Sequence, residues 1–115
     1  MKTHKKVTYT LDEDTLLQID IVILMLFGEG KKTSKSAYIK NCLINSFDIF
    51  EAEIEENNIE KLSRWSKKYE GTKPITVTLP FEVVEKLDYY SQVLKMKKSH
   101  LVMCSVLLDE ERELI

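Results

Sequence analysis

One short alternating pattern occurs twice in the sequence, and this duplication constrains the fold more than any other feature. Val7-Thr8-Tyr9-Thr10-Leu11 and Ile75-Thr76-Val77-Thr78-Leu79 both read apolar, Thr, apolar, Thr, Leu. Alternation over five residues rich in β-branched side chains predicts a strand with its apolar residues on one face and its threonines on the other. Each strand therefore needs other elements to cover its apolar face.

A helix is expected directly after each strand. Asp12-Glu13-Asp14 supplies an N-cap candidate and first-turn acids, while Pro80 suits the first helical position and is followed by Glu82. Local propensity also permits a strand over Ile19 to Phe27, but the register of the duplication favours a helix there. The expected core positions are Thr15, Leu16 and Ile19 in the first copy and Val83, Val84, Leu87, Tyr90 and Leu94 in the second.

A turn and a second helix complete each copy. The turns are expected over residues 28–33 and 95–98. The strands align at an offset of 68 residues and the second helices at an offset of 63, so the first copy has five extra residues around the end of its first helix. The apolar stripes of the second helices are Tyr38, Ile39, Cys42, Leu43 and Phe47, then Leu101, Val102, Ser105, Val106 and Leu107.

These elements predict a mainly helical chain with two repeats and a connection between them. The first repeat is expected over residues 1–56, a linker over 57–73 that could carry a short helix, and the second repeat over 74–115. A unit of fifty-odd residues buries too little surface to be stably folded alone, so the two halves are expected to share a core. The linker is long enough to bring the second strand back beside the first.

The order strand, helix, turn, helix resembles the ribbon-helix-helix family of Arc, MetJ and CopG type. The second repeat carries the clearer match, Ile75-Thr76-Val77-Thr78-Leu79-Pro80 followed later by Met96-Lys97-Lys98-Ser99-His100-Leu101-Val102. The first repeat keeps Ser34-Lys35-Ser36 but has Asp12 where the family has Pro. Finding both short motifs twice in the same order makes the resemblance more specific than either motif alone.

The resemblance implies both an architecture and a ligand. Family members are normally dimers whose two strands form an antiparallel ribbon that lies in the major groove of double-stranded DNA. Two repeats in one chain imply a mainly α fold with a short two-stranded antiparallel β-ribbon, in which the repeats form an intramolecular pseudo-dimer. Tandem proteins of this kind resemble the TraY-type proteins of conjugative plasmids, and their halves need not read identical half-sites.

The family also implies two sets of DNA-contacting residues. Threonine offers a hydroxyl and a methyl group, so readout by these side chains is expected to be permissive and shared with DNA shape. The first turn of each second helix is the expected phosphate anchor, because its free N–H groups and positive dipole end attract anions. The expected base contacts are Lys6, Thr8, Thr10, Thr76 and Thr78, and the expected phosphate contacts are Ser34, Lys35, Ser36, Lys97, Lys98 and Ser99.

The leading functional interpretation is a transcriptional regulator that occupies an operator. An accessory protein of a plasmid relaxosome, which binds near the origin of transfer and contacts a relaxase, has the same biochemistry and remains an alternative. A protein-interaction module or an antitoxin is a further alternative, favoured by the formal net charge of −2, which is unusual for a DNA-binding domain. Lysines nevertheless gather at the repeat starts and turns, where they can form a local positive face.

Other functional classes find little support in the sequence. No catalytic residue pattern, phosphate-binding glycine loop or metal-ligand spacing is present, so neither an enzyme nor a cofactor is expected. Cys42 and Cys104 are expected to be buried thiols. The chain shows no secretory pattern and no membrane span, which predicts a cytoplasmic protein. The helix after the first strand has more apolar residues than one buried face needs, so self-association through Leu17, Ile21 and Leu24 is expected; the alternative is that Trp65 and Tyr69 of the linker cover this surface.

Overall fold

The computed structural model describes residues 3–55 and 73–113, which form six elements in the order expected from the duplication. Within these residues the chain is mainly helical, with four helices and one two-stranded antiparallel sheet, as predicted. Most of the expected linker lies outside the described residues, together with Trp65 and Tyr69, which that linker contains. The elements are β1 (His4–Leu11), α1 (Glu13–Gly28), α2 (Lys35–Glu55), β2 (Lys73–Pro80), α4 (Phe81–Leu94) and α5 (Lys98–Glu113).

The two strands pair along their whole length. Thr8 faces Thr76 in the antiparallel register, and these residues are separated by 68 positions, which is the offset between the two copies of the pattern. The residues of the inner face, apart from the half-buried Val7, are buried, and the threonines of the opposite face are exposed. The alternation therefore predicted both faces of the ribbon correctly. The buried strand residues are Tyr9, Leu11, Ile75, Val77 and Leu79.

Each strand leads directly into a helix. Residues 13–28 are helical, so the alternative of a strand over Ile19 to Phe27 is wrong. Thr15, Ile19 and Val22 recur at helical spacing and are buried, which secures the helix against the core. Pro80 is the last residue of β2 and precedes α4 rather than occupying its first turn, a shift of one residue from the prediction. Its fixed φ of −57° still suits the entry into the helix.

The five extra residues of the first copy lie at the end of α1, where they were expected. Helix α1 has 16 residues and α4 has 14, and the connection to the next helix spans six residues at 29–34 against three at 95–97. Gly30 and Lys95 each take a positive φ in these turns, at 82° and 56°. The shorter turn thus places a lysine in the left-handed region that more often holds glycine.

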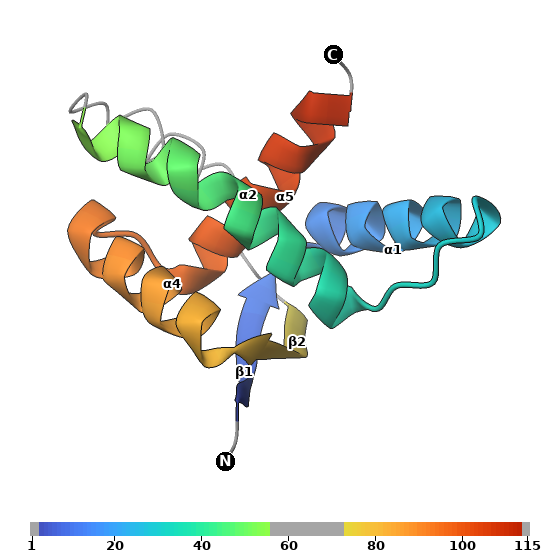
Figure 1. Cartoon of the computed structure of the whole chain (residues 1–115), viewed down its shortest axis with the longest axis horizontal. Coiled ribbons are helices and arrows are strands. Elements are labelled where there is room, and N and C mark those ends of the chain that lie inside the picture. The colour runs from blue at the N-terminus through green and yellow to red at the C-terminus, as the bar shows by residue number, and fades with distance from the viewer. Residues whose placement is uncertain (1–2, 56–72, 114–115) are drawn as a thin grey trace.

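The core lies between the inner face of the ribbon and the second helix of each half. Figure 1 shows α2 and α5 crossing near the centre, with α1 and α4 on opposite sides of the molecule. The contact between α2 and α5 is the most extensive between any two described helices. Ile39, Leu43, Leu101 and Val102 have no exposed surface. The two halves of the chain therefore share one core, as their size required.

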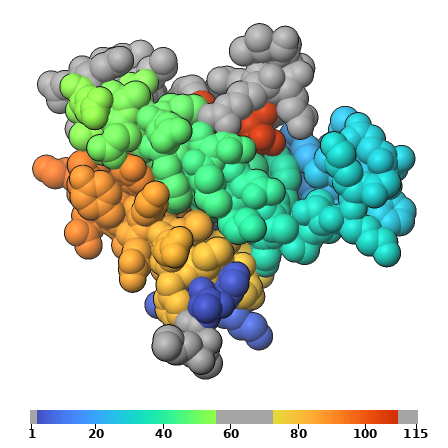
Figure 2. Space-filling view, in the orientation of Figure 1, coloured from blue at the N-terminus to red at the C-terminus, as the bar shows by residue number. Residues whose placement is uncertain are grey.

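Helix α1 also carries a set of apolar side chains that the described core does not cover. Figure 2 shows the atoms of α1 and the following turn projecting at one side of the molecule. Val22 is buried, and Ile23 and Leu26 pack partly against the core. The exposed set, called here the α1 apolar stripe, consists of Leu17, Ile21, Leu24, Met25 and Phe27, whose exposed fractions run from 42% to 69%.

Candidate functional site

The outward face of the ribbon gathers all five residues expected to contact bases. Lys6 lies across from Thr78, and Thr8 lies across from Thr76, where the two hydroxyl oxygens are 3.0 Å apart and share a hydrogen bond. Thr10 lies across from Pro74. All of these side chains are exposed, so the face presents hydroxyl and methyl groups together with one lysine. Strand pairing joins the two sets of predicted residues into a single surface.

The starts of α2 and α5 are fixed to the outer edges of the strands. The Thr78 N–H donates to Ser36 Oγ at 3.0 Å, and the Thr10 N–H donates to Ser99 Oγ at 3.1 Å. Each bond crosses between the two halves of the chain, because Ser36 and Thr10 lie before the undescribed residues 56–72 and Thr78 and Ser99 lie after them. The consequence is that one helix N-terminus lies at the β2 edge and the other at the β1 edge of the ribbon.

The caps of these two helices differ. In α2 the Ala37 N–H donates to Ser34 Oγ at 3.1 Å, which satisfies one of the free amides of the first turn. In α5 the corresponding position is Lys97, which has no side-chain acceptor but adds an exposed positive charge. The second helix start is therefore more positive.

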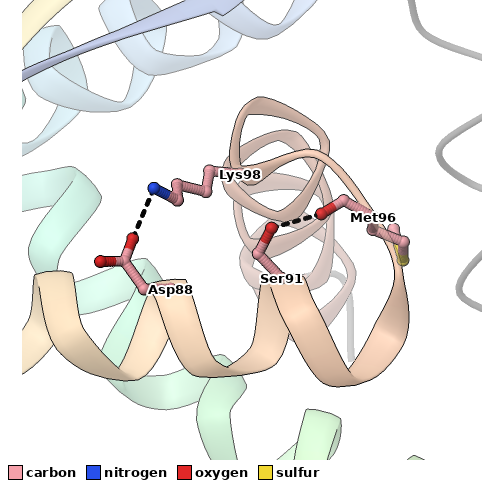
Figure 3. A network of polar contacts seen from close by, with 4 residues as sticks. All are labelled: Asp88, Ser91, Met96 and Lys98. Carbon is pink, nitrogen blue, oxygen red and sulfur yellow. Dashed lines mark hydrogen bonds and ion pairs between the residues drawn. The ribbon is translucent and has the colours of Figure 1, made fainter.

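The lysine that opens each second helix forms an ion pair with the preceding helix. Lys35 Nζ lies 3.5 Å from Asp20 Oδ1, and Lys98 Nζ lies 2.6 Å from Asp88 Oδ1 (Figure 3). Figure 3 also shows the Ser91 hydroxyl donating to the Met96 carbonyl oxygen across the turn between α4 and α5. These exposed pairs add little stability, but they hold both lysines beside the ribbon edges.

The charge of Asp88 also acts on the residue beneath the ribbon. Burial, together with the nearby Asp88 carboxylate, raises the pKa of Tyr9 to about 12. The Tyr9 hydroxyl therefore stays neutral at any physiological pH. Tyr9 serves as part of the ribbon's inner face rather than as a titrating group.

Sequence reasoning missed several residues that shape this site. Asp20 and Asp88 are separated by the same 68 positions as the strands, so the duplication could have identified them as a related pair. Lys73 forms an ion pair with Glu13, with Nζ and Oε1 3.1 Å apart. Pro74 completes the outward face opposite Thr10, which depends on the strand register and has no signal in the linear sequence.

The described residues contain neither a metal-binding cluster nor a disulfide. In that part of the chain, no group of three or more His, Cys, Asp or Glu side chains is arranged to hold a metal ion. Cys42 and Cys104 are both buried, as expected, and neither forms a disulfide; burial raises the pKa of the Cys104 thiol to about 12. No helix among the described residues is long and apolar enough to cross a membrane.

Comparison with known proteins gives no relative for this chain. No family model, no curated protein and no solved structure matches it.

Proposed function

We propose that this chain is a tandem ribbon-helix-helix protein that binds double-stranded DNA by inserting its β-ribbon into the major groove. In this arrangement the two repeats form an intramolecular pseudo-dimer, and the pair Thr8 and Thr76 lies on its pseudo-two-fold axis. The observation that carries the proposal is the crossed pair of hydrogen bonds from Thr10 to Ser99 and from Thr78 to Ser36. The two bonds place one helix N-terminus at each edge of the ribbon, beside its exposed polar face.

This geometry suits a DNA duplex for a physical reason. The major groove is about 12 Å wide and admits a two-stranded ribbon, which then has one phosphate backbone along each of its edges. Helix N-termini at both edges present N–H groups and positive dipole ends to those backbones. Threonine side chains on the outward face can then reach base edges and thymine methyl groups.

The role we propose is that of a transcriptional regulator that blocks a promoter by occupying it. A relaxosome accessory protein would use the same surface near an origin of transfer, so the location of the binding site distinguishes the two roles. A protein-interaction module or an antitoxin would use the scaffold without strong DNA specificity. The net charge of −2 is compatible with DNA binding only when positive groups are concentrated at the ribbon edges, as Lys97 and Lys98 are.

The first test is fluorescence anisotropy of the purified chain with duplexes tiled across the region upstream of its own gene. Tight binding to one tile, with affinity that falls steeply as salt increases, is the expected result. The double variant Thr8→Ala, Thr76→Ala should bind that tile more weakly by at least about fivefold, the lower limit for a lost base contact. Both side chains are exposed, so the circular dichroism spectrum should not change.

A surface change away from the ribbon provides the control. Gln92→Ala on α4 alters an exposed polar side chain and should leave the affinity unchanged. Equal affinity of the Thr8, Thr76 double variant and the unmodified chain would contradict base contact by the ribbon. If no tile is bound specifically, the same assay with duplexes from an origin of transfer tests the relaxosome role.

A further inference from the structure

The two edges of the ribbon carry related clefts whose charges differ. The cleft beside β1, called here the β1-side cleft, is lined by Lys5, Lys97 and Lys98 together with Asp88 and the Ser99 hydroxyl. Lys98 forms the ion pair with Asp88 already described. Lys5 and Lys97 form no ion pair with any residue in the described part of the chain. Two positive charges are therefore left unbalanced in this cleft.

The cleft beside β2 has the opposite balance. This β2-side cleft is lined by Lys35 and Lys73, and by the carboxylates of Glu13, Asp14 and Asp20. Each lysine forms an ion pair there, Lys35 with Asp20 and Lys73 with Glu13. Asp14 remains as an excess negative charge at the cleft. A phosphate group that approached this edge would meet no unbalanced lysine among the lining residues.

Two differences between corresponding positions supply two of the three charges by which the clefts differ, and the third is Asp14, whose counterpart Glu82 does not line the β1-side cleft. Lys5 corresponds to Lys73 by the strand offset of 68, and Lys98 corresponds to Lys35 by the helix offset of 63. The β1-side cleft gains a charge because Lys97 stands where the first repeat has Ser34. It also lacks an acid, because the residue that corresponds to Glu13 is Phe81.

We propose that the protein grips DNA asymmetrically, with the phosphate backbone along β1 bound in the β1-side cleft and the backbone along β2 held much more weakly. This inference rests on the proposed function. It adds that the anchored DNA strand is the one whose backbone lies along β1. Lys5, Lys97 and the first-turn N–H groups of α5 surround the anchored phosphates. The Ser99 hydroxyl, which accepts from Thr10, still has its own proton to donate.

The outward face of the ribbon is also asymmetric, because its two ends carry different residues. Lys6 and Thr78 face each other at one end, whereas Thr10 and Pro74 face each other at the other. A lysine donates to the O6 and N7 acceptors of guanine, and an apolar ring contacts the thymine methyl group. A specific site that satisfies both ends is non-palindromic, so the protein occupies it in one orientation.

The first experiment compares corresponding lysines in the full chain. Binding of Lys5→Ala, Lys97→Ala and Lys73→Ala to a short mixed-sequence duplex is measured by anisotropy over a series of salt concentrations. Lys5→Ala and Lys97→Ala should each weaken binding and lower the salt slope by about one ion, as expected for a lost phosphate contact. Lys73→Ala releases the Glu13 carboxylate, which weakens binding by charge repulsion, but it should leave the salt slope nearly unchanged because Lys73 is paired with Glu13 and contacts no phosphate in this arrangement.

A gain of function tests the same idea in the other direction. Ser34→Lys together with Glu13→Gln moves the net charge of the β2-side cleft two units toward that of the β1-side cleft, although Asp14 remains. This double variant should bind the duplex more tightly and increase the salt slope. Equal decreases in the salt slope from Lys5→Ala and Lys73→Ala, or no gain from the double variant, would overturn the asymmetric grip.

The anchored strand can also be identified directly on a duplex that binds specifically. Neutral methylphosphonate groups are placed at the flanking phosphates of one strand at a time. Weakened binding from only one of the two strands supports the proposal, and equal weakening from both overturns it. If the unmodified chain binds no duplex at low salt, the proposed function itself fails, an outcome that differs from all of these.

Discussion

Individual side chains in this chain divide into those whose position follows from the sequence and those fixed by distant contacts. The outward threonines follow from strict alternation, because side chains of a strand point to alternate faces. Ser36 and Ser99 were correctly placed at the helix starts, but their bonds to strand amides join residues 42 and 89 positions apart. No local pattern signals such a bond. Each serine therefore holds the start of its helix against a strand, in addition to any contact that it makes with phosphate.

Replacing either serine should loosen its helix start from the strand. Ser99→Ala removes the acceptor of the Thr10 N–H and should reduce the free energy of unfolding by about 1 kcal/mol. Urea denaturation monitored by circular dichroism measures this loss. Ser99→Thr keeps a hydroxyl at the same position and should recover most of the stability. If alanine and threonine had the same effect, the hydrogen bond would contribute nothing.

Among the elements, α1 is the one whose buried face could not be predicted from hydrophobic periodicity. Most side chains from Leu16 to Phe27 are apolar, so the sequence does not single out the buried face. The duplication resolved part of this, because it predicted the buried Thr15 and Ile19, which correspond to Val83 and Leu87 of α4. It did not single out the buried Val22, and Leu16 is only partly buried. Some positions of the α1 apolar stripe correspond to polar residues of α4, although Met25 corresponds to Val93. Leu17 and Leu24, for example, correspond to Glu85 and Gln92.

The α1 apolar stripe gives a testable expectation of self-association, which would make binding to adjacent DNA sites cooperative. Leu24 is 69% exposed, so Leu24→Glu should change the free energy of unfolding by no more than about 0.5 kcal/mol. The same change should shift the sedimentation profile toward the monomer. Gln92→Glu introduces glutamate at the corresponding position of α4 and should have no effect on association. A monomeric unmodified chain would rule out this use of the stripe.

At the scale of the whole molecule, the two halves share both the ribbon and the core. The ribbon takes one strand from each half, and α2 packs against α5 at the centre. The sequence predicted a shared core from the small size of each half, and it predicted the order of every described element. It could not predict the charge difference between the two ribbon edges, because that difference depends on which side chains form ion pairs across the fold.

A change at the centre should therefore destabilise both halves together. Leu43 has no exposed surface, and Leu43→Ala should reduce the free energy of unfolding by about 2 to 5 kcal/mol. Hydrogen exchange should show faster exchange in α4 and α5 as well as in α2. Leu17→Ala, in the α1 apolar stripe, provides the exposed control and should have little effect. Faster exchange confined to the first half would show that the halves unfold independently.

The antiparallel pairing of β1 with β2 also sets an order of events during synthesis. Paired residues are separated by between 62 positions, for Leu11 and Lys73, and 76 positions, for His4 and Pro80. At about 5 to 20 residues per second, β1 waits roughly 3 to 15 seconds on the ribosome before its partner strand has been made. Throughout that time Tyr9 and Leu11 have no strand beside them. The ribbon consequently forms only after β1, α1 and α2 have all been synthesised.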